Sequence, residues 1–302
     1  MQPLTKVTLC LFGVFALIVL LWAFSPVRYV AYAVTGRSDC PPGEAARAFY
    51  RKRGQLGAEA RLQSTVRVIG RDAASELWET PMGRFWMPKG SSQVIPEDMA
   101  EQEVDIYGTA GGGIRPGDVV LDCGANVGLF VRKALDQGAG LVVAIEPGPE
   151  NLASLRRNLS AEIASGRVVV YPKGVWDKPD TLTLRIDSQN SAADTFVGEH
   201  GSASAGIQVP LVPIDQLVDE LRLTRVDFIK MDIEGAERKA LAGARGTLAR
   251  FRPRLAISSY HLPGDVAAID MLVNAARGDY RRICGSCSQG GGRLNAEVLW
   301  FR

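Results

Sequence analysis

The chain has 302 residues, of which 46% are hydrophobic and 23% charged, a composition typical of a globular protein with one large domain and an appendage. Its 35 basic and 33 acidic residues give a formal net charge of +2, so no strong positive field favours nucleic acid. We therefore expect no nucleic-acid partner.

The N-terminal segment is apolar. The run from Val7 to Phe24 contains no charged residue, and at about 1.5 Å per residue a helix of this length spans about 27 Å, close to the hydrocarbon core of a bilayer. We interpret it as an uncleaved membrane anchor. A cleaved signal peptide, with the sequence AYA at residues 31–33 as its cleavage box, is the alternative. More basic residues follow the run than precede it, which predicts a single-pass membrane protein with a cytoplasmic catalytic domain.

The five cysteines are Cys10, Cys40, Cys123, Cys284 and Cys287, an odd number without the dense spacing of a secreted disulfide scaffold. This usage favours a reducing compartment. Cys284 and Cys287 form a single C-x-x-C, but a structural zinc site needs four ligands. We therefore interpret both as ordinary thiols near a turn.

Between the anchor and the main domain, the sequence predicts a linker helix and a small β structure. Residues 44–53 can form a short basic helix, either beside anionic headgroups or in solvent. Alternation of apolar and polar residues between Leu62 and Pro88, with a turn at residues 81–83, predicts small antiparallel strands. The expected organisation is an anchor and juxtamembrane segment (1–38), a linker helix and β appendage (39–96) and a catalytic domain (97–302).

From Asp118 onward, apolar runs alternate with helical stretches, the pattern of βαβ units that form a parallel sheet buried on both faces. We expect an α/β fold with a doubly wound, mostly parallel, seven-stranded Rossmann-like sheet. Its last two strands, 280–285 and 296–302, form an edge hairpin joined by a loop at 286–293. The polar stretch from Asp187 to Ala205 is typical of a mobile loop and is a candidate lid over the acceptor, with His200 on its surface.

The run VVLDCGANVG, from Val119 to Gly128, ends an apolar strand in a glycine-rich turn before a helix. Glycines there let the backbone approach a ligand, and the helix N-terminus presents free N–H groups. The next strand ends in Glu146, where a carboxylate can accept hydrogen bonds from two ribose hydroxyls. Asp122 at the mouth of the turn is unfavourable beside a pyrophosphate but favourable beside the ammonium of a methionine moiety. The pattern favours S-adenosylmethionine over NAD, with these binding residues: Asp122, Gly124, Ala125, Asn126, Gly128 and Glu146.

Three segments together resemble the FkbM family of class I methyltransferases: Val119 to Phe130 (VVLDCGANVGLF), Ala144 to Pro147 (AIEP) and Asp227 to Glu237 (DFIKMDIEGAE). The resemblance covers roughly residues 97–260, and the third segment is its most specific part. It implies methyl transfer from S-adenosylmethionine, usually to oxygen, on acceptors as varied as sugars, polyketides and lipids.

The resemblance adds further cofactor candidates. In similar enzymes a residue shortly before the glycine turn touches the cofactor, and Glu103 and Tyr107 lie four apart on a helix expected at 97–108. Related folds place adenine contacts after the third strand, where Trp176 and Asp177 stand. The plain structural alternatives are an exposed Glu103, a packed Tyr107 and a Trp176 in the core.

Ligands of open parallel sheets bind outside the carboxyl ends of the strands. Asp232 and Glu234 follow the fourth strand, Lys230 shares the strand face of Asp232, and His261, one of two histidines, follows the fifth. We expect His261 to be the base that removes a hydroxyl proton, with the other three in the catalytic site to orient the acceptor or the cofactor. Alternatively, Glu234 caps the next helix and Lys230 pairs with Asp232. Two carboxylates without a clear third ligand do not predict a metal site.

The sequence therefore predicts a membrane-tethered, S-adenosylmethionine-dependent O-methyltransferase that acts on a small-molecule, glycan or lipid-linked hydroxyl. A non-catalytic nucleotide-binding regulator and an NAD-dependent oxidoreductase are the alternatives. The acidic residues at the strand ends argue against the first, and the chemistry of the glycine turn argues against the second.

Overall fold

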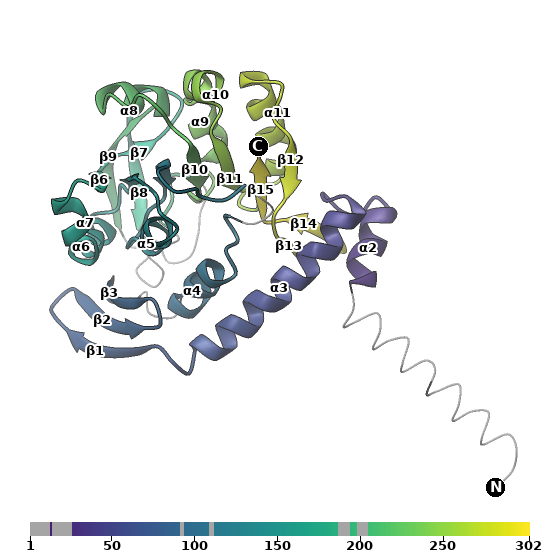
Figure 1. Cartoon of the computed structure of the whole chain (residues 1–302), viewed down its shortest axis with the longest axis horizontal. Helices are drawn as coiled ribbons and strands as arrows, with labels where there is room; N and C mark the ends of the chain where they lie inside the picture. The colour runs from purple at the N-terminus through teal and green to yellow at the C-terminus, as the bar shows by residue number, and fades with distance from the viewer. Residues whose placement is uncertain (1–12, 14–25, 91–93, 109–111, 187–193, 198–204) are drawn as a thin grey trace, which may run out of the picture.

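A seven-stranded sheet forms the centre of the structure, a computed structural model (Figure 1). The structure describes Gly13 and residues 26–90, 94–108, 112–186, 194–197 and 205–302. Only β15 runs antiparallel to its neighbours, so the predicted doubly wound, mostly parallel fold is confirmed. The strands in spatial order are β12 (Arg282–Cys284), β15 (Val298–Phe301), β11 (Arg254–Ser258), β10 (Phe228–Met231), β4 (Val119–Cys123), β5 (Leu141–Ile145) and β6 (Val168–Tyr171).

Helices cover both faces of this sheet, because alternate residues of each central strand enter different cores. On β4, Val120 packs in one core with Phe130 of the following helix, whereas Leu121 packs in the other core with Leu217. The helices of the α/β part are α5 (Leu129–Asp136), α6 (Pro149–Asn158), α7 (Ser160–Ala164), α8 (Ile214–Glu220), α9 (Glu237–Ala242), α10 (Arg245–Phe251) and α11 (Asp265–Ala276).

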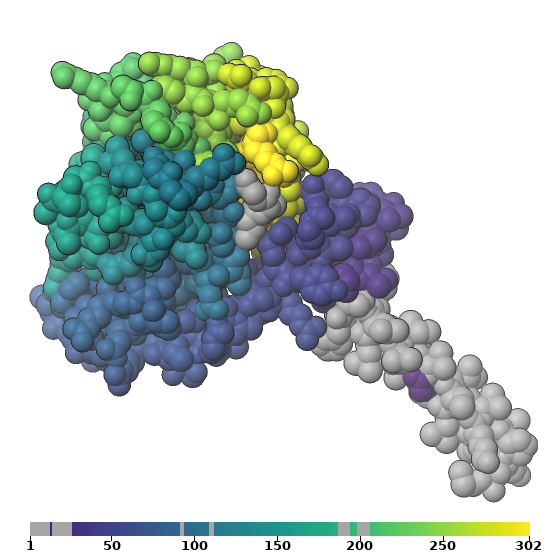
Figure 2. Space-filling model, in the orientation of Figure 1, coloured from purple at the N-terminus to yellow at the C-terminus, as the bar shows by residue number. Residues whose placement is uncertain are grey.

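Residues 26–90 and 94–103 pack along one side of the α/β part (Figure 2). The predicted antiparallel strands are confirmed as a three-stranded sheet. The predicted helix at 44–53 lies within a longer helix whose Ala45, Ala48 and Phe49 are buried in the main core, so it is neither a free linker nor a surface helix. The N-terminal elements are α2 (Val27–Val34), α3 (Pro42–Leu62), β1 (Arg67–Arg71), β2 (Ser75–Thr80), β3 (Gly83–Pro88) and α4 (Ile95–Glu103).

Two further small sheets flank the main one. β8 (Asp180–Ile186) and β9 (Ala205–Val212) pair as antiparallel strands, and β9 also pairs with β7 (Gly174–Val175). The predicted edge hairpin of β12 and β15 is confirmed, but its connection is not a plain loop, since it contains the hairpin of β13 (Cys287–Gly290) and β14 (Arg293–Ala296). Most of the candidate lid, including His200, lies outside the described residues.

In the described part of the chain, no helix is both long and apolar enough to cross a membrane. The anchor expected from Val7 to Phe24 lies outside that part, apart from Gly13. The anchor therefore stays a prediction.

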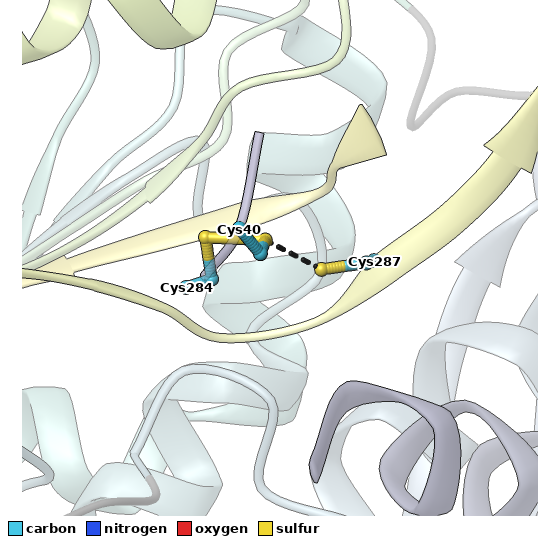
Figure 3. A group of neighbouring side chains, drawn as sticks. All are labelled: Cys40, Cys284 and Cys287. Atoms are coloured by element: carbon cyan, nitrogen blue, oxygen red, sulfur yellow. Dashed lines mark hydrogen bonds between the residues drawn. A yellow bond between two sulfur atoms is a disulfide. The ribbon is translucent and has the colours of Figure 1, made fainter. Parts of the chain in front are cut away.

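Three buried cysteines join the start of α3 to the edge of the main sheet (Figure 3). Cys40 and Cys284 form a disulfide, and the Sγ of Cys287 lies 2.8 Å from the Sγ of Cys40. The interpretation of Cys284 as an ordinary thiol is therefore wrong: its partner lies 244 residues away in sequence, where spacing gives no signal. Because disulfides persist in oxidising environments, the cysteines no longer support a reducing compartment.

We expect the Cys40→Ser variant to lose about 2–4 kcal/mol of unfolding free energy, the usual contribution of a native disulfide. The Cys284→Ser variant should lose less, because Cys287 lies close enough to pair with Cys40. Denaturant unfolding without reductant measures the loss of unfolding free energy in both variants. Peptide mapping of the non-reduced Cys284→Ser variant shows whether Cys40 pairs with Cys287. A free Cys40 thiol in the Cys284→Ser variant contradicts the alternative pairing.

Candidate active site

The glycine turn lies where the chain leaves β4, beside the end of β10. These two neighbouring strands lead into helices on different faces of the sheet, the arrangement that opens a ligand crevice in such folds. Gly124 has a φ of +81°, and a Cβ at this position would lie 2.0 Å from the carbonyl oxygen of Asp232. Only glycine therefore permits this close contact between the two strand ends.

Asp122 and Lys230 form an ion pair beneath the turn. The Lys230 Nζ lies 3.1 Å from the Asp122 Oδ1, and both side chains are buried. The same Nζ donates a hydrogen bond of 2.7 Å to the carbonyl oxygen of Gly124. Burial alone lowers the pKa of Lys230, but Asp122 and Asp232 outweigh this effect and raise it. Asp122 therefore holds Lys230 under the turn and does not line the cavity, so its predicted direct contact with the cofactor is wrong.

The Asp122→Asn substitution should cost about 3–5 kcal/mol of unfolding free energy, because it removes one partner of a buried ion pair. The double variant Asp122→Asn/Lys230→Met should lose less, since it leaves no uncompensated lysine beside the turn. Urea unfolding of the two variants provides the comparison. A single variant that is at least as stable as the double variant would show that the pair is not coupled.

Glu146 follows β5 and faces the cavity from the side opposite β10. Its two carboxylate oxygens accept hydrogen bonds from the backbone N–H of Asn126, at 2.8 Å, and of Gly148, at 2.7 Å. Burial raises the pKa of Glu146 to about 7. The two backbone hydrogen bonds fix the carboxylate beside the glycine turn, and its contact with ribose hydroxyls stays a prediction.

The cavity at this edge is strongly acidic. Among the described residues that line it, seven carry carboxyl groups and one carries an amine. Such a surface attracts cationic ligands and repels phosphates. The carboxyl groups belong to Glu97, Asp98, Glu101, Glu146, Asp194, Asp232 and Glu234, and the amine to Lys230.

His261 lies among three carboxylates. Its Nε2 is 3.5 Å from the Asp232 Oδ1 and 3.4 Å from the Glu234 Oε1, and its Nδ1 is 3.0 Å from the Glu237 Oε1. Burial alone lowers the pKa of His261, but Glu234, Glu237 and Asp232 outweigh it and raise the pKa to about 11. These carboxylates favour the protonated imidazole as long as no other cation neutralises them, and the prediction that His261 is the base stays a prediction. His261 lines a neighbouring cavity, behind Asp232 and Glu234.

Asp232 and Glu234 face the main cavity as predicted. Tyr107 also lines it, and its hydroxyl donates a hydrogen bond of 2.8 Å to the Asp232 Oδ2. The alternatives were that Lys230 pairs with Asp232 and that Glu234 caps the next helix, and the structure shows neither. Lys230 is ion-paired with Asp122, and the helix after Glu234 has no side-chain cap hydrogen bond.

Four other predicted cofactor residues lie away from the cavity. Glu103 is the last residue of α4, which ends there instead of continuing to residue 108. Its side chain is exposed and pairs with Arg61. Trp176 is buried in a separate core, and the Asp177 Oδ2 accepts a hydrogen bond of 2.7 Å from Lys239.

The fourth of these residues is Gly128, which has a φ of +93°. A Cβ at this position would lie 2.8 Å from Leu159, so this glycine permits the start of α5. Ala125 and Asn126 do line the cavity.

Helix α4 contributes three carboxyl groups to the cavity that the sequence did not indicate, those of Glu97, Asp98 and Glu101. Asp98 and Glu101 lie one turn apart and both face the cavity. Burial raises the pKa of Asp98 to about 7, and it raises that of Glu101 well above its ordinary value. The only sequence signal was an acidic first turn, which equally suits an ordinary helix N-terminus.

A family model for the methyltransferase FkbM domain matches residues 122–282. This chain belongs to that family. It is similar to 31-O-demethyl-FK506 methyltransferase FkbM of Streptomyces tacrolimicus, with 29% identity over 157 residues, 43% of this chain and 60% of that protein. It is also similar to 2-O-methyltransferase NoeI of Sinorhizobium fredii, with 27% identity over 156 residues, 46% of this chain and 62% of that protein.

Among solved structures, a methyltransferase FkbM from Methylobacillus flagellatus KT is similar at 22% identity and a TM-score of 0.46, over 85% of this chain and 60% of that one. The matches to the two curated relatives above each span about 60% of the relative's length. The family assignment rests on the match at residues 122–282, which include the glycine turn, the strand ends and His261.

Proposed function

We propose that this chain transfers a methyl group from S-adenosylmethionine to a hydroxyl oxygen of a small-molecule, glycan or lipid-linked acceptor beside a membrane. The observation that carries the proposal is the acidic cavity at the switch between β4 and β10 in a member of the FkbM family. A sulfonium cofactor matches the charge of this cavity, whereas the pyrophosphate of NAD does not.

The residues present fit S-adenosylmethionine. Glu146 is the acceptor for its ribose hydroxyls, while Gly124, Ala125 and Asn126 let the backbone approach the ligand. The carboxylates around the cavity would attract its positively charged sulfonium and ammonium groups. When bound, this cofactor supplies an electrophilic methyl group on a positively charged sulfur.

The chain's own task is to position the acceptor and to remove one proton. Asp98 lies in the cavity with a pKa near neutrality, which suits a general base at physiological pH. Asp232 is held by the hydroxyl of Tyr107 and, with Glu234, faces the same space from the end of β10. We assign proton acceptance to Asp98 and orientation of the acceptor to Asp232 and Glu234.

Transfer to oxygen is supported by the names of two relatives, an O-demethyl-FK506 methyltransferase and a 2-O-methyltransferase. The membrane part of the proposal depends on the apolar run from Val7 to Phe24. The basic residues after it favour a cytoplasmic catalytic domain, while the Cys40–Cys284 disulfide favours the opposite side. Protease accessibility of the full chain in sealed inverted vesicles tests the cytoplasmic assignment, since a protected catalytic domain there contradicts it.

The acceptor is tested by incubating the purified full chain, in detergent, with S-adenosylmethionine labelled at the methyl group and with fractionated membrane and soluble extracts. We expect label in a product that is stable to mild base, as an ether is and an ester is not. Base-labile product contradicts transfer to a hydroxyl, and label only in soluble products contradicts a membrane-bound acceptor. A non-catalytic binding protein would retain the cofactor and label nothing.

A further inference from the structure

Three potential metal ligands converge at the carboxyl end of β10. Asp232 and Glu234 follow that strand, and His261 follows β11, its neighbour in the sheet. One ligand atom from each of the three lies within 4.8 Å of the other two. The sequence placed all three residues at predicted strand ends but offered only the two carboxylates as metal ligands, because the distance from His261 to them depends on how β10 and β11 pair.

The imidazole of His261 is held in one orientation. Glu237, the first residue of α9, is fully buried, and its Oε1 lies 3.0 Å from the Nδ1 of His261. The same oxygen accepts a hydrogen bond of 2.9 Å from the backbone N–H of Ile233. A carboxylate behind a histidine nitrogen is the usual support for a metal-binding histidine, because it fixes the ring and directs the other nitrogen forward.

The other nitrogen is aimed at the two carboxylates. The His261 side chain is only 4% exposed, and neither its Nε2 nor the buried Asp232 Oδ1 makes a hydrogen bond of good geometry to a described residue. Nε2 lies 3.4–3.5 Å from the oxygens of Glu234 and Asp232. Ligands about 2.0–2.2 Å from a shared metal are separated by roughly 3.0–3.6 Å, which matches this spacing.

The backbone at Glu234 adds an independent sign of constraint. Glu234 has a φ of 53° and the following Gly235 a φ of 94°, and the left-handed region is unfavourable for glutamate. The carbonyl oxygen of Glu234 accepts a hydrogen bond of 2.7 Å from the Thr195 hydroxyl. The fold therefore holds this carboxylate toward the cavity at a cost in backbone energy, as is common at functional sites.

We propose that Asp232, Glu234 and His261 bind one divalent transition-metal ion, of the Mn²⁺ or Zn²⁺ class, at the wall of the main cavity. The imidazole nitrogen favours such ions over Mg²⁺ and Ca²⁺, which prefer oxygen ligands. Because Asp232 and Glu234 line the cavity, the remaining coordination positions of the ion would be open to an acceptor bound there. The ion takes the acceptor hydroxyl as a ligand and lowers its pKa, so that Asp98 removes the proton more easily. This role rests on the proposed function, whereas metal binding itself does not.

The test is Mn²⁺ binding to the purified full chain after treatment with EDTA, without cofactor or acceptor, followed by electron paramagnetic resonance. We expect one stoichiometric site and a ¹⁴N coupling from a coordinated imidazole. His261→Gln should remove the nitrogen coupling, and Asp232→Asn should weaken binding by more than tenfold. Glu237→Gln, which alters only the support of the ring, should weaken binding about 10–100-fold.

The matched control is Glu97→Gln, which removes a carboxylate from the same cavity but outside the three ligands and should leave both readouts unchanged. Circular dichroism confirms that each variant is folded. Binding without nitrogen coupling, or binding that Glu97→Gln weakens as much as Asp232→Asn, shows a merely acidic surface and overturns the proposal. Metal binding without methyl transfer contradicts the proposed function alone, and EDTA-resistant methyl transfer without metal binding contradicts this site alone.

Discussion

The Asp98→Asn variant should have a kcat lower by about 10²–10⁴-fold, the range expected when a general base is removed, with affinity for S-adenosylmethionine within about threefold of the unsubstituted chain. Asparagine has nearly the same shape but does not accept a proton. Steady-state kinetics on the acceptor identified by labelling measures kcat, and calorimetry measures cofactor affinity. The matched control is Glu103→Gln, a carboxylate at the end of the same helix that faces solvent and whose loss should leave kcat unchanged.

The pH profile distinguishes a base from a structural carboxylate. Burial raises the pKa of Asp98 to about 7, so turnover should decline as the pH falls through this value and the carboxylate becomes protonated. The charged groups that act on Asp98 are Glu97, Asp232 and Glu234, which raise its pKa, and Lys230, which lowers it. If the residual activity of Asp98→Asn declines over the same acidic pH range, another group causes that decline. This result contradicts the role of Asp98 as the base.

The Glu146→Gln variant should bind S-adenosylmethionine about 10–100-fold more weakly, since hydrogen bonds to charged groups contribute about 1.5–3 kcal/mol. Each carboxylate oxygen of Glu146 accepts one backbone hydrogen bond, from Asn126 or from Gly148. Glutamine has only one acceptor oxygen, so one of these two hydrogen bonds is lost. Isothermal titration calorimetry measures the loss. Glu150→Gln, an exposed residue in the first turn of α6, is the control that should bind normally.

The affinity for the cofactor should also depend on pH through Glu146. Its pKa is raised by burial from 4.5 to about 7, so the folded state binds its proton more tightly than the unfolded state. The contribution of Glu146 to unfolding free energy therefore falls as the pH rises from about 4.5 to about 7. Ribose hydroxyls donate to the ionised form, so affinity should rise over this range and level off above pH 7. An affinity that is constant from pH 5 to 8 contradicts the carboxylate–ribose contact.

The central sheet could be predicted because its strands are short apolar runs separated by helical stretches, and this pattern reflects burial on both faces. The extent of α3 could not be predicted, since its apolar positions contact a core formed by residues far along the chain. The hairpin β13–β14 was missed for a related reason. Its strands contain Ser288, Gln289, Arg293 and Asn295, which resemble a polar loop, although Cys287, Leu294 and Ala296 are buried.

Residues that directly follow a predicted strand were correctly expected at the cavity, as for Glu146, Asp232 and Glu234. The same expectation failed at Asp122, which lies within β4 and not after it. Side chains inside a strand point to the faces of the sheet, and the register that sets Lys230 opposite Asp122 is not visible in either strand alone. The role assigned to Asp98 depends on how α4 packs over the sheet edge, which no local pattern shows.

The central claim is that the acidic cavity selects a sulfonium nucleoside over a phosphate-bearing one. Separate calorimetric titrations of the purified full chain with S-adenosylmethionine and with NAD test it most directly. We expect one binding site for S-adenosylmethionine, weakened in Glu146→Gln, and no measurable binding of NAD. Binding of NAD with equal or higher affinity, or an S-adenosylmethionine affinity unchanged in Glu146→Gln, would contradict the account.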